Sequence, residues 1–450
     1  MIEINELKKE LLAHINDEIE LSPADIAESL KELKKLDENE YNELLARLDE
    51  KDLAEAAIEM PDHMLKDVIE SIPQDKIVEA IETLQSDDAT DLIQNIEEID
   101  ENKAKELFDS LEVESKKEIS ALIDYEDDKA GAYMQVELFS AHLDEKLEIA
   151  LNRFRKLKKS GELESIFALF VTEKSGVLRY AIPIDDLLLF EPKLTLSENL
   201  KGNENIYQPH FAHDDDDIAA VAQIVKDYDL SSIAIVNKAG VLVGRITNYD
   251  IHDFLEESAT EQIYKLAGVN DDAEEEESAI KAGRARAIWL GVNLITAILS
   301  SIVISFFDES INKIVALAVL MPIVASMGGN VGTQALTVTV RRLGLGEISF
   351  NHAKGVLFRE LSIALANGAI FAIAVGLVAH FWFHISSLGF VIAAAMLINL
   401  SCAGFFGAVI PITIKRFGID PAVASPVLLM TMTDLIGFLS FLGLATWILI

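Results

Sequence analysis

Five long apolar stretches constrain the fold of this chain more than any other feature of its sequence. They span residues 287–307, 314–340, 361–383, 388–414 and 421–450, and they contain almost no charged side chains. Each exceeds the ~20 residues that an α-helix needs to cross the ~30 Å hydrocarbon core of a bilayer. Buried helices of soluble domains rarely reach this length. The sequence therefore predicts an all-α transmembrane domain of five helices over residues 284–450.

Basic side chains in the short loops predict the orientation of these helices. They precede the first stretch or lie between the second and third and between the fourth and fifth stretches: Lys281, Arg284, Arg286, Arg341, Arg342, Lys354, Arg359, Lys415 and Arg416. Because basic loops stay on the cytoplasmic side, we expect a multi-pass protein of the plasma (inner) membrane. Its N-terminus then lies in the cytoplasm and its C-terminus outside.

Acidic residues are concentrated in the first part of the chain. Residues 1–280 carry 28 basic and 69 acidic side chains, a net charge of −41, whereas the rest carries +4. Such a surface repels phosphate backbones, so we expect no nucleic-acid partner. The single cysteine, Cys402, excludes a disulfide framework. We find no nucleophile–base pair, no His/Cys metal spacing and no glycine-rich phosphate loop, and we predict that the chain is not an enzyme.

An apolar residue recurs every 12 residues in this acidic part, each time before a polar turn. The repeated positions are Leu36, Leu48, Met60, Ile72 and Leu84, and the repeat resumes at Leu111. Ser22 followed by Pro23 is a typical helix start. Short helices of fixed period cannot each bury a face alone, so we expect them to stack. The pattern predicts an acidic α-helical superhelical domain over residues 1–126; an irregular helical bundle is the alternative.

Two later segments have β-branched residues on both sides of a short turn. Residues 165–184 surround a Lys-Ser-Gly turn, and residues 232–247 surround a Lys-Ala-Gly turn. This composition favours β-hairpins. The repeated pattern resembles a tandem pair of α/β CBS domains, at 127–197 and 198–256. CBS pairs often bind adenosine nucleotides, and nucleotide binding stays open here because the segments have no phosphate-binding glycine loop.

Residues 257–283 connect these parts to the first apolar stretch. An amphipathic helix reaches into them, with apolar residues at Leu255, Ala259, Ile263 and Leu266. An acidic run from Asp271 to Glu277 follows. Such runs are usually solvated surface. We therefore predict a connecting helix followed by an acidic linker.

Asp434 is the only acidic residue in the fifth apolar stretch, 13 residues after Pro421. This spacing places it near the middle of the bilayer, where a carboxylate costs at least ~2.5–3.5 kcal/mol on insertion scales. Such a group is expected to face water, a partner or a cation. We interpret Asp434 as a cation site or a proton relay; a structural hydrogen-bonded acid is the alternative.

The second apolar stretch combines helix-weakening residues with amides. In chain order they are Pro322, Gly328, Gly329, Asn330, Gly332 and Gln334. A proline and three glycines are expected to break or thin the helix, and irregular backbone at membrane depth is tolerated only against protein or water. Close helix packing on small residues is the alternative. The adjacent amides favour the wall of a pore.

Together these residues resemble the MgtE family of magnesium channels. The run that begins at Pro322 is similar to the family's most specific signature, and the segment from Asp420 to Asp434 is similar to its last-span signature. Residues 257–263 resemble its connecting (plug) helix. The order of parts also matches, with an acidic helical domain, a CBS pair, a connecting helix and five spans.

The resemblance implies a homodimer with one pore, lined by the second and fifth spans. Asp434 matches the family's selectivity acid, and the six residues of the second stretch are implied to line the pore. Mg²⁺ prefers octahedral oxygen ligands and sheds water reluctantly, so carboxylate and amide oxygens can hold it with its waters retained. Two facing carboxylates also need a cation to offset their repulsion. The implied activity is a Mg²⁺-selective influx.

The resemblance also implies that cytosolic Mg²⁺ closes the channel by binding between acidic faces of the soluble domains. The implied regulatory ligands are Asp87, Asp91, Asp229, Asp250, Asp253, Glu261 and Asp420. Acidic faces repel each other when apart, and bridging divalent cations favour the compact arrangement. High internal Mg²⁺ then stops further entry.

Two other functions stay open on the sequence. An ion-coupled transporter of divalent cations (Mg²⁺, Mn²⁺, Co²⁺) also suits a lone midplane acid and an interrupted helix. A membrane-anchored CBS nucleotide sensor without transport is less favoured, because an inert anchor needs neither the glycine–amide run nor Asp434. The residue pattern does not rank Mg²⁺ against Mn²⁺, Co²⁺ and Ni²⁺, since oxygen-rich sites accept several cations.

Overall fold

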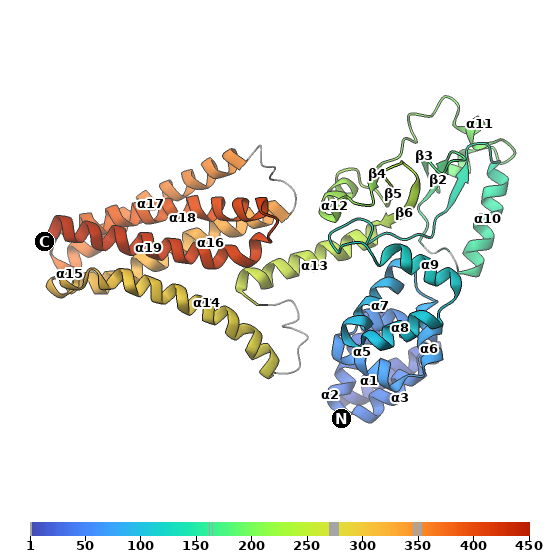
Figure 1. The fold of residues 1–450 in the computed structure, drawn as a ribbon, viewed down its shortest axis with the longest axis horizontal. Coiled ribbons are helices and arrows are strands. Elements are labelled where there is room, and N and C mark those ends of the chain that lie inside the picture. The colour runs from blue at the N-terminus through green and yellow to red at the C-terminus, as the bar shows by residue number, and fades with distance from the viewer. Residues whose placement is uncertain (1, 162, 164, 270–278, 345–347, 349–352) are drawn as a thin grey trace. The chain divides into compact units, whose positions relative to one another are not determined.

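The computed structural model describes the whole chain except residues 1, 162, 164, 270–278, 345–347 and 349–352. The chain forms two compact units, Met1–His252 and Asp253–Ile450. The first combines stacked helices with two small sheets, and the second is built from helices (Figure 1). The predicted fold class, an acidic helical part followed by an α/β pair and five transmembrane helices, is confirmed.

Short helices, α1 to α9, form the first half of unit one. Helices two apart in the sequence pack on each other, as α2 does on α4, α5 on α7 and α7 on α9, so the chain winds into a superhelical stack. The predicted start at Ser22 is confirmed, because Ser22 Oγ accepts a hydrogen bond from the Asp25 amide and caps α2. The helices are α1 (Ile2–Ile15), α2 (Pro23–Leu36), α3 (Glu38–Arg47), α4 (Glu50–Ile58), α5 (Asp62–Ser71), α6 (Gln74–Ile81), α7 (Ser86–Ile99), α8 (Glu101–Ser110) and α9 (Val113–Leu122).

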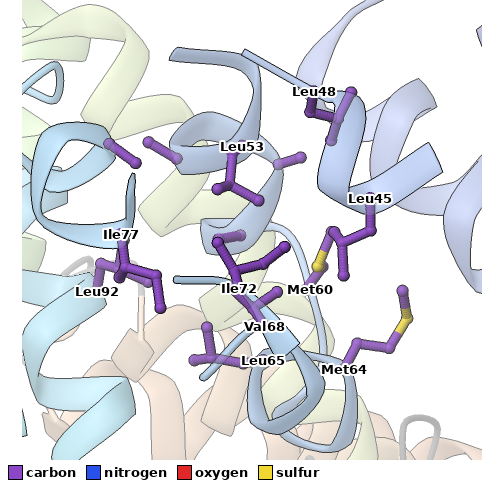
Figure 2. Packing of buried hydrophobic residues seen from close by; sticks show 14 of the residues in the cluster. Leu45, Leu48, Leu53, Met60, Met64, Leu65, Val68, Ile72, Ile77 and Leu92 are labelled. Atoms are coloured by element: carbon purple, nitrogen blue, oxygen red, sulfur yellow. The ribbon is translucent and has the colours of Figure 1, made fainter. Parts of the chain in front are cut away.

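The 12-residue repeat marks the ends of these helices. Leu48, Ile72 and Leu111 directly follow α3, α5 and α8, and all three are buried. Figure 2 shows Leu48 and Ile72 among the side chains of one continuous apolar core. Leu36, at the end of α2, differs in being 46% exposed. An apolar residue at the end of a helix thus joins one layer of the stack to the next.

Both predicted hairpins are confirmed. β2 (Ala168–Thr172) pairs antiparallel with β3 (Leu178–Pro183), and β5 (Ser232–Val236) pairs antiparallel with β6 (Leu242–Thr247). β1 (Ser140–His142) and β4 (Phe211–His213) add in parallel, which gives the sheet orders β1-β2-β3 and β4-β5-β6. The helical segments of this part are α10 (Leu147–Ser160), the 3₁₀ helix η1 (Asp186–Leu189), α11 (Leu196–Leu200) and α12 (Ile218–Asp227).

The two hairpin turns are tied to each other. Gly176 and Gly240 have φ angles of 82° and 76°, in the left-handed region that glycine adopts readily. The Leu178 amide donates to the Gly240 carbonyl, and the Leu242 amide donates to the Gly176 carbonyl, each at 3.1 Å. The sheets also share a small apolar core, made of Phe170, Leu178, Ala234 and Val236. The pair therefore behaves as one body.

Among the described residues, five helices are long and apolar enough to cross a membrane, which confirms the predicted spans. α18 is the most buried of them and packs against α16, α17 and α19, whereas α14 contacts mainly α19. The helices of unit two are α14 (Ala279–Ser305), the short α15 (Asp308–Lys313), α16 (Ala316–Gly344), α17 (Ala353–Phe383), α18 (Ser386–Arg416) and α19 (Pro421–Leu449). α13 (Asn248–Ala267) directly follows β6. The predicted acidic linker from Asp271 to Glu277 lies outside the described residues.

The expected break in the second span is wrong, because α16 is one continuous helix with Pro322 inside it. Pro322 lies in the second turn, and the helix continues through it although proline cannot donate a backbone hydrogen bond there. The glycines are accommodated by neighbouring helices: Gly328 packs against Asn399 of α18, and Gly332 packs against Leu429 of α19. Close packing on small residues, the alternative interpretation, accounts for the backbone at these two positions.

Candidate ion pathway and regulatory junctions

A stripe of exposed, mostly polar residues runs along one face of α16 and contains three of the six predicted pore residues. In the single chain its members are exposed: Pro322, Ser326, Asn330, Thr333, Gln334 and Thr337. Their spacing of three or four residues places them on one side of the helix. Gly329, beside Asn330, is half-buried, with open space where a Cβ would lie. Polar groups at membrane depth face a bundle interior or a water-filled cavity rather than lipid. We call this face the polar stripe of α16.

Asp434 lies in the middle of α19, which packs against α16. Its side chain is half-buried. Within the part of the chain that the structure describes, no donor forms a hydrogen bond or an ion pair with its carboxylate. The alternative of a structural hydrogen-bonded acid therefore finds no support among these residues. A midspan carboxylate of this kind calls for water, a cation or a second subunit.

Asp87 and Asp250 lie close together in unit one, although they are far apart in the sequence. Asp87 belongs to the first turn of α7 and Asp250 to the first turn of α13, and the Gln135 side chain hydrogen-bonds to both. Gln135 Nε2 donates to Asp250 Oδ1 at 3.5 Å, and the Thr247 amide donates to Oδ2 at 2.7 Å. The site therefore joins the helical stack to the second sheet.

Arg245 places a buried positive charge in this site. It is 1% exposed, and its Nε and Nη1 donate to the Glu137 and Ser165 carbonyls at 3.1 Å and 2.7 Å. Burial lowers the pKa of Arg245, while Asp250, Glu137 and Asp87 act in the opposite direction. Arginine stays charged at neutral pH. We call Asp87, Gln135, Arg245 and Asp250 the Asp87 junction.

The Asp87 junction suits a hard cation. Burial raises the pKa of Asp87 well above its ordinary value, and the neighbouring charges of Asp88 and Asp250 raise it further. Asp87 Oδ1 and Gln135 Oε1 are buried oxygens without a hydrogen-bond partner. Carboxylate and amide oxygens are the ligands that Mg²⁺ prefers. The described residues contain no cluster of three or more His, Cys, Asp or Glu side chains that would hold a metal, so an ion here would keep several waters.

Glu261, Lys265 and Asp420 form a second site, the Asp420 junction, within unit two. Lys265 Nζ forms an ion pair with Glu261 one turn earlier on α13, and it lies 3.0 Å from Asp420 Oδ2. Asp420 also caps α19, because its Oδ1 accepts from the Ala422 amide at 2.8 Å. Burial lowers the pKa of Lys265, but hydrogen bonds to the two carboxylates outweigh it and raise the pKa overall. Two of the predicted ligands, Glu261 and Asp420, therefore both pair with the ammonium group of Lys265.

The remaining predicted regulatory acids are exposed. Asp91 lies one turn after Asp87 on α7, and Asp253 lies on α13. Asp229 follows α12 with a φ angle of 50°, in the left-handed region. Their exposure distinguishes them from the buried Asp87, and their role as ligands stays a prediction.

Comparison with known proteins places these features in one family. A model described as a divalent cation transporter, MgtE, matches residues 321–444; models of the MgtE intracellular N domain and of a CBS domain match residues 21–128 and 206–257. The magnesium transporter MgtE of Enterococcus faecalis is 30% identical over 329 residues, which cover 73% of this chain and 71% of that protein. The chain belongs to the MgtE family.

A second relative and a solved structure are also similar to this chain. The MgtE protein of Thermus thermophilus is 28% identical over 334 residues, 74% of this chain and 72% of the relative. A crystal structure of the soluble part of a magnesium transporter matches 57% of this chain and 99% of its own, with a TM-score of 0.48 at 22% identity. The match at residues 321–444 includes both the polar stripe of α16 and Asp434.

In this MgtE chain, sequence reasoning missed the groups that neighbour the predicted acids. Lys265 was detectable, because it lies four residues after Glu261 on a helix, the spacing of a typical ion pair. Arg245 and Gln135 gave no such signal, since their partners come from other elements. Asn399, the buried amide of α18, was also missed among the apolar residues around it.

Proposed function

We propose that this chain transports Mg²⁺ into the cell as a homodimer, through a channel lined by α16 and α19 of both copies. The observation that carries the proposal is Asp434, a midspan carboxylate that has no donor among the described residues and lies on a helix packed against α16. Two copies would bring two such carboxylates together, and a divalent cation offsets their repulsion. The amides of the polar stripe can contact the waters that Mg²⁺ retains.

The two junctions support closure of the channel by cytosolic Mg²⁺. The Asp87 junction offers two buried oxygens without a hydrogen-bond partner, so bound Mg²⁺ would hold the helical stack against the second sheet. The Asp420 junction links the connecting helix α13 to the start of α19. Mg²⁺ that binds more tightly to the compact arrangement shifts the population toward it.

Growth rescue of a bacterium that lacks magnesium uptake tests the proposed transport. Wild-type protein is expected to restore growth at low external Mg²⁺, whereas Asp434→Asn and Asp434→Ala are expected to lose it, because the amide or the methyl group carries no charge for the ion. The matched control is Glu309→Gln. Glu309 is an acid of the short α15 that pairs with Lys313 outside the proposed pathway, and this variant is expected to grow like wild type.

The outcome at Asp434 decides the proposal. If Asp434→Asn supports normal growth while the protein is present at wild-type level, then the carboxylate does not select the ion and the proposed pathway is wrong. Current measured at a fixed proton gradient separates a channel from the ion-coupled transporter, since only coupled transport follows that gradient.

A further inference from the structure

Asn399 is a buried polar residue that the proposed function does not use. It lies 13 residues into α18, near the middle of this span, and it is fully buried. Its Nδ2 donates to the Val324 carbonyl of α16 at 2.9 Å. Its Oδ1 is buried and has no hydrogen-bond partner. One half of the amide thus binds α16, and the other half is unpaired.

Two glycines make room for this amide. A Cβ at Gly328 of α16 or at Gly437 of α19 would lie less than 3.0 Å from Asn399 Nδ2. Real Cβ atoms do not approach a neighbour so closely, so neither glycine accepts a side chain while Asn399 keeps its position. The amide of α18 therefore lies where α16 and α19 approach each other, and it fills the space between their backbones.

This contact lies at the level of the proposed ion site. Gly437 is three residues after Asp434 on α19, and Gly328 is two residues before Asn330 on α16. A rigid group between these two backbones sets the distance between the helix that carries Asp434 and the helix that carries the polar stripe.

Stability alone does not explain an asparagine at this position. A buried acceptor without a partner is costly, and a buried polar side chain contributes to stability only through the hydrogen bonds that it forms. Leucine has nearly the shape of asparagine and would avoid the unpaired Oδ1. The hydrogen bond to the Val324 carbonyl is what leucine cannot supply.

We propose that Asn399 is a positioning residue of the ion pathway: it fixes the spacing of α16 and α19 beside Asp434, and so the size of the cation that is accepted. This inference rests on the proposed Mg²⁺ transport. Mg²⁺ requires octahedral geometry with ligands at about 2.0–2.1 Å, whereas Ca²⁺ accepts more ligands at about 2.3–2.6 Å. A change in helix spacing therefore affects the two ions differently.

The first test compares Mg²⁺ and Ca²⁺ flux into proteoliposomes for wild type and Asn399→Leu. We expect the ratio of Mg²⁺ to Ca²⁺ flux to fall about fivefold or more. Leucine fills the space but cannot hydrogen-bond to the Val324 carbonyl, so α16 and α18 are no longer held together and the site loses its fit to the smaller ion. The thermal unfolding midpoint of the solubilised protein should stay equal or rise. An unchanged flux ratio overturns the inference, whether total flux stays normal or falls together with the midpoint.

A second pair of variants decides the matter if Asn399→Leu fails to fold. Gly437→Ala should lower the flux ratio, because its methyl group displaces Asn399, and Gly437→Ala combined with Asn399→Ala should recover part of it. The matched control is Gly443→Ala on the same helix, where a Cβ meets nothing within 4 Å. If Gly437→Ala and Gly443→Ala both keep the wild-type ratio, Asn399 does not set the spacing.

The two proposals fail in different ways. If Mg²⁺ flux in Asp434→Asn equals that of the wild type, the proposed function itself is overturned. If Asp434→Asn abolishes Mg²⁺ flux but the ratio of Mg²⁺ to Ca²⁺ flux is unchanged in both Asn399→Leu and Gly437→Ala, only the role of Asn399 is overturned.

Discussion

The two junctions place acidic groups near a cation in opposite ways. In the Asp87 junction the cation, Arg245, is 1% exposed, and its Nε and Nη1 donate to backbone carbonyls. Arg245 Nη2 and Asp87 Oδ1 are both buried without a hydrogen-bond partner. In the Asp420 junction the cation, Lys265, pairs directly with both carboxylates. The first arrangement retains ligands for a further ion, whereas the second already has its acids satisfied. If cytosolic Mg²⁺ closes the channel as we propose, we expect it to bind more tightly at the Asp87 junction than at the Asp420 junction.

Removal of residues 1–126 tests most directly which of the two junctions regulates the channel. It deletes Asp87 together with the whole α1–α9 core, which is distinct from the cores around the sheets. We expect a channel that still conducts but needs roughly tenfold more cytosolic Mg²⁺ for half-closure, because the compact state loses its preferential affinity. Patch-clamp titration of the cytosolic face measures this. Unchanged sensitivity would assign the regulation to the Asp420 junction instead.

Replacement of Lys265 leaves the carboxylates of the Asp420 junction without a cationic partner, as Asp87 Oδ1 is in the Asp87 junction. In Lys265→Met, Glu261 and Asp420 lose their shared ammonium, so Mg²⁺ becomes the cation available to join them. We expect half-closure at about fivefold lower cytosolic Mg²⁺, the effect of ~1 kcal/mol for a partly exposed ion pair. Lys313→Met, which breaks the exposed Glu309–Lys313 pair, is the matched control. Equal responses of the two variants would argue against a regulatory role for Lys265.

The smallest expected effect concerns protons at Asp87. The pKa of Asp87 is raised in the folded protein, so the folded state binds more protons than the unfolded chain between pH ~4 and the raised pKa. In Mg²⁺-free buffer the junction therefore loses stability as pH rises through this range. Mg²⁺ competes with the proton, so acidification should raise the Mg²⁺ needed for half-protection by about two- to threefold per pH unit.

Limited proteolysis at residues 127–130, with Mg²⁺ titrated at several pH values, measures this competition. Asp87→Asn removes the titrating group, so its protection is expected to be independent of pH and weaker in its response to Mg²⁺. Glu309→Gln serves again as the control, because it changes an exposed acid outside the junction. If protection in Asp87→Asn still depends on pH, then a group other than Asp87 binds the proton.

Much of the fold could be predicted because its signals are local. Span length, the Ser22–Pro23 helix start and the turns at Gly176 and Gly240 each depend on a few neighbouring residues, and each was confirmed. The 12-residue repeat predicted stacking, since an apolar residue at a helix end needs the next helix to cover it.

The site was predicted less completely because its partners are distant in the sequence. Asp87 and Asp250 were chosen as acids, but their approach through Gln135 depends on how α7 meets the second sheet. The expected break in α16 was wrong for the same reason. Whether glycines weaken a helix depends on what packs against them, and here Asn399 and Leu429 occupy the space.

The polar stripe of α16 has a consequence for how the protein is made. A single inserted chain would present Asn330, Thr333 and Gln334 to surrounding acyl chains, which solvate amides and hydroxyls poorly. In the homodimer that we propose, a second copy would cover this face and supply hydrogen-bond partners or enclose water. Association would then be the last step of membrane folding rather than an event between finished subunits. Newly inserted chains at low abundance would wait, half-assembled and open to quality-control proteases, until they meet a partner.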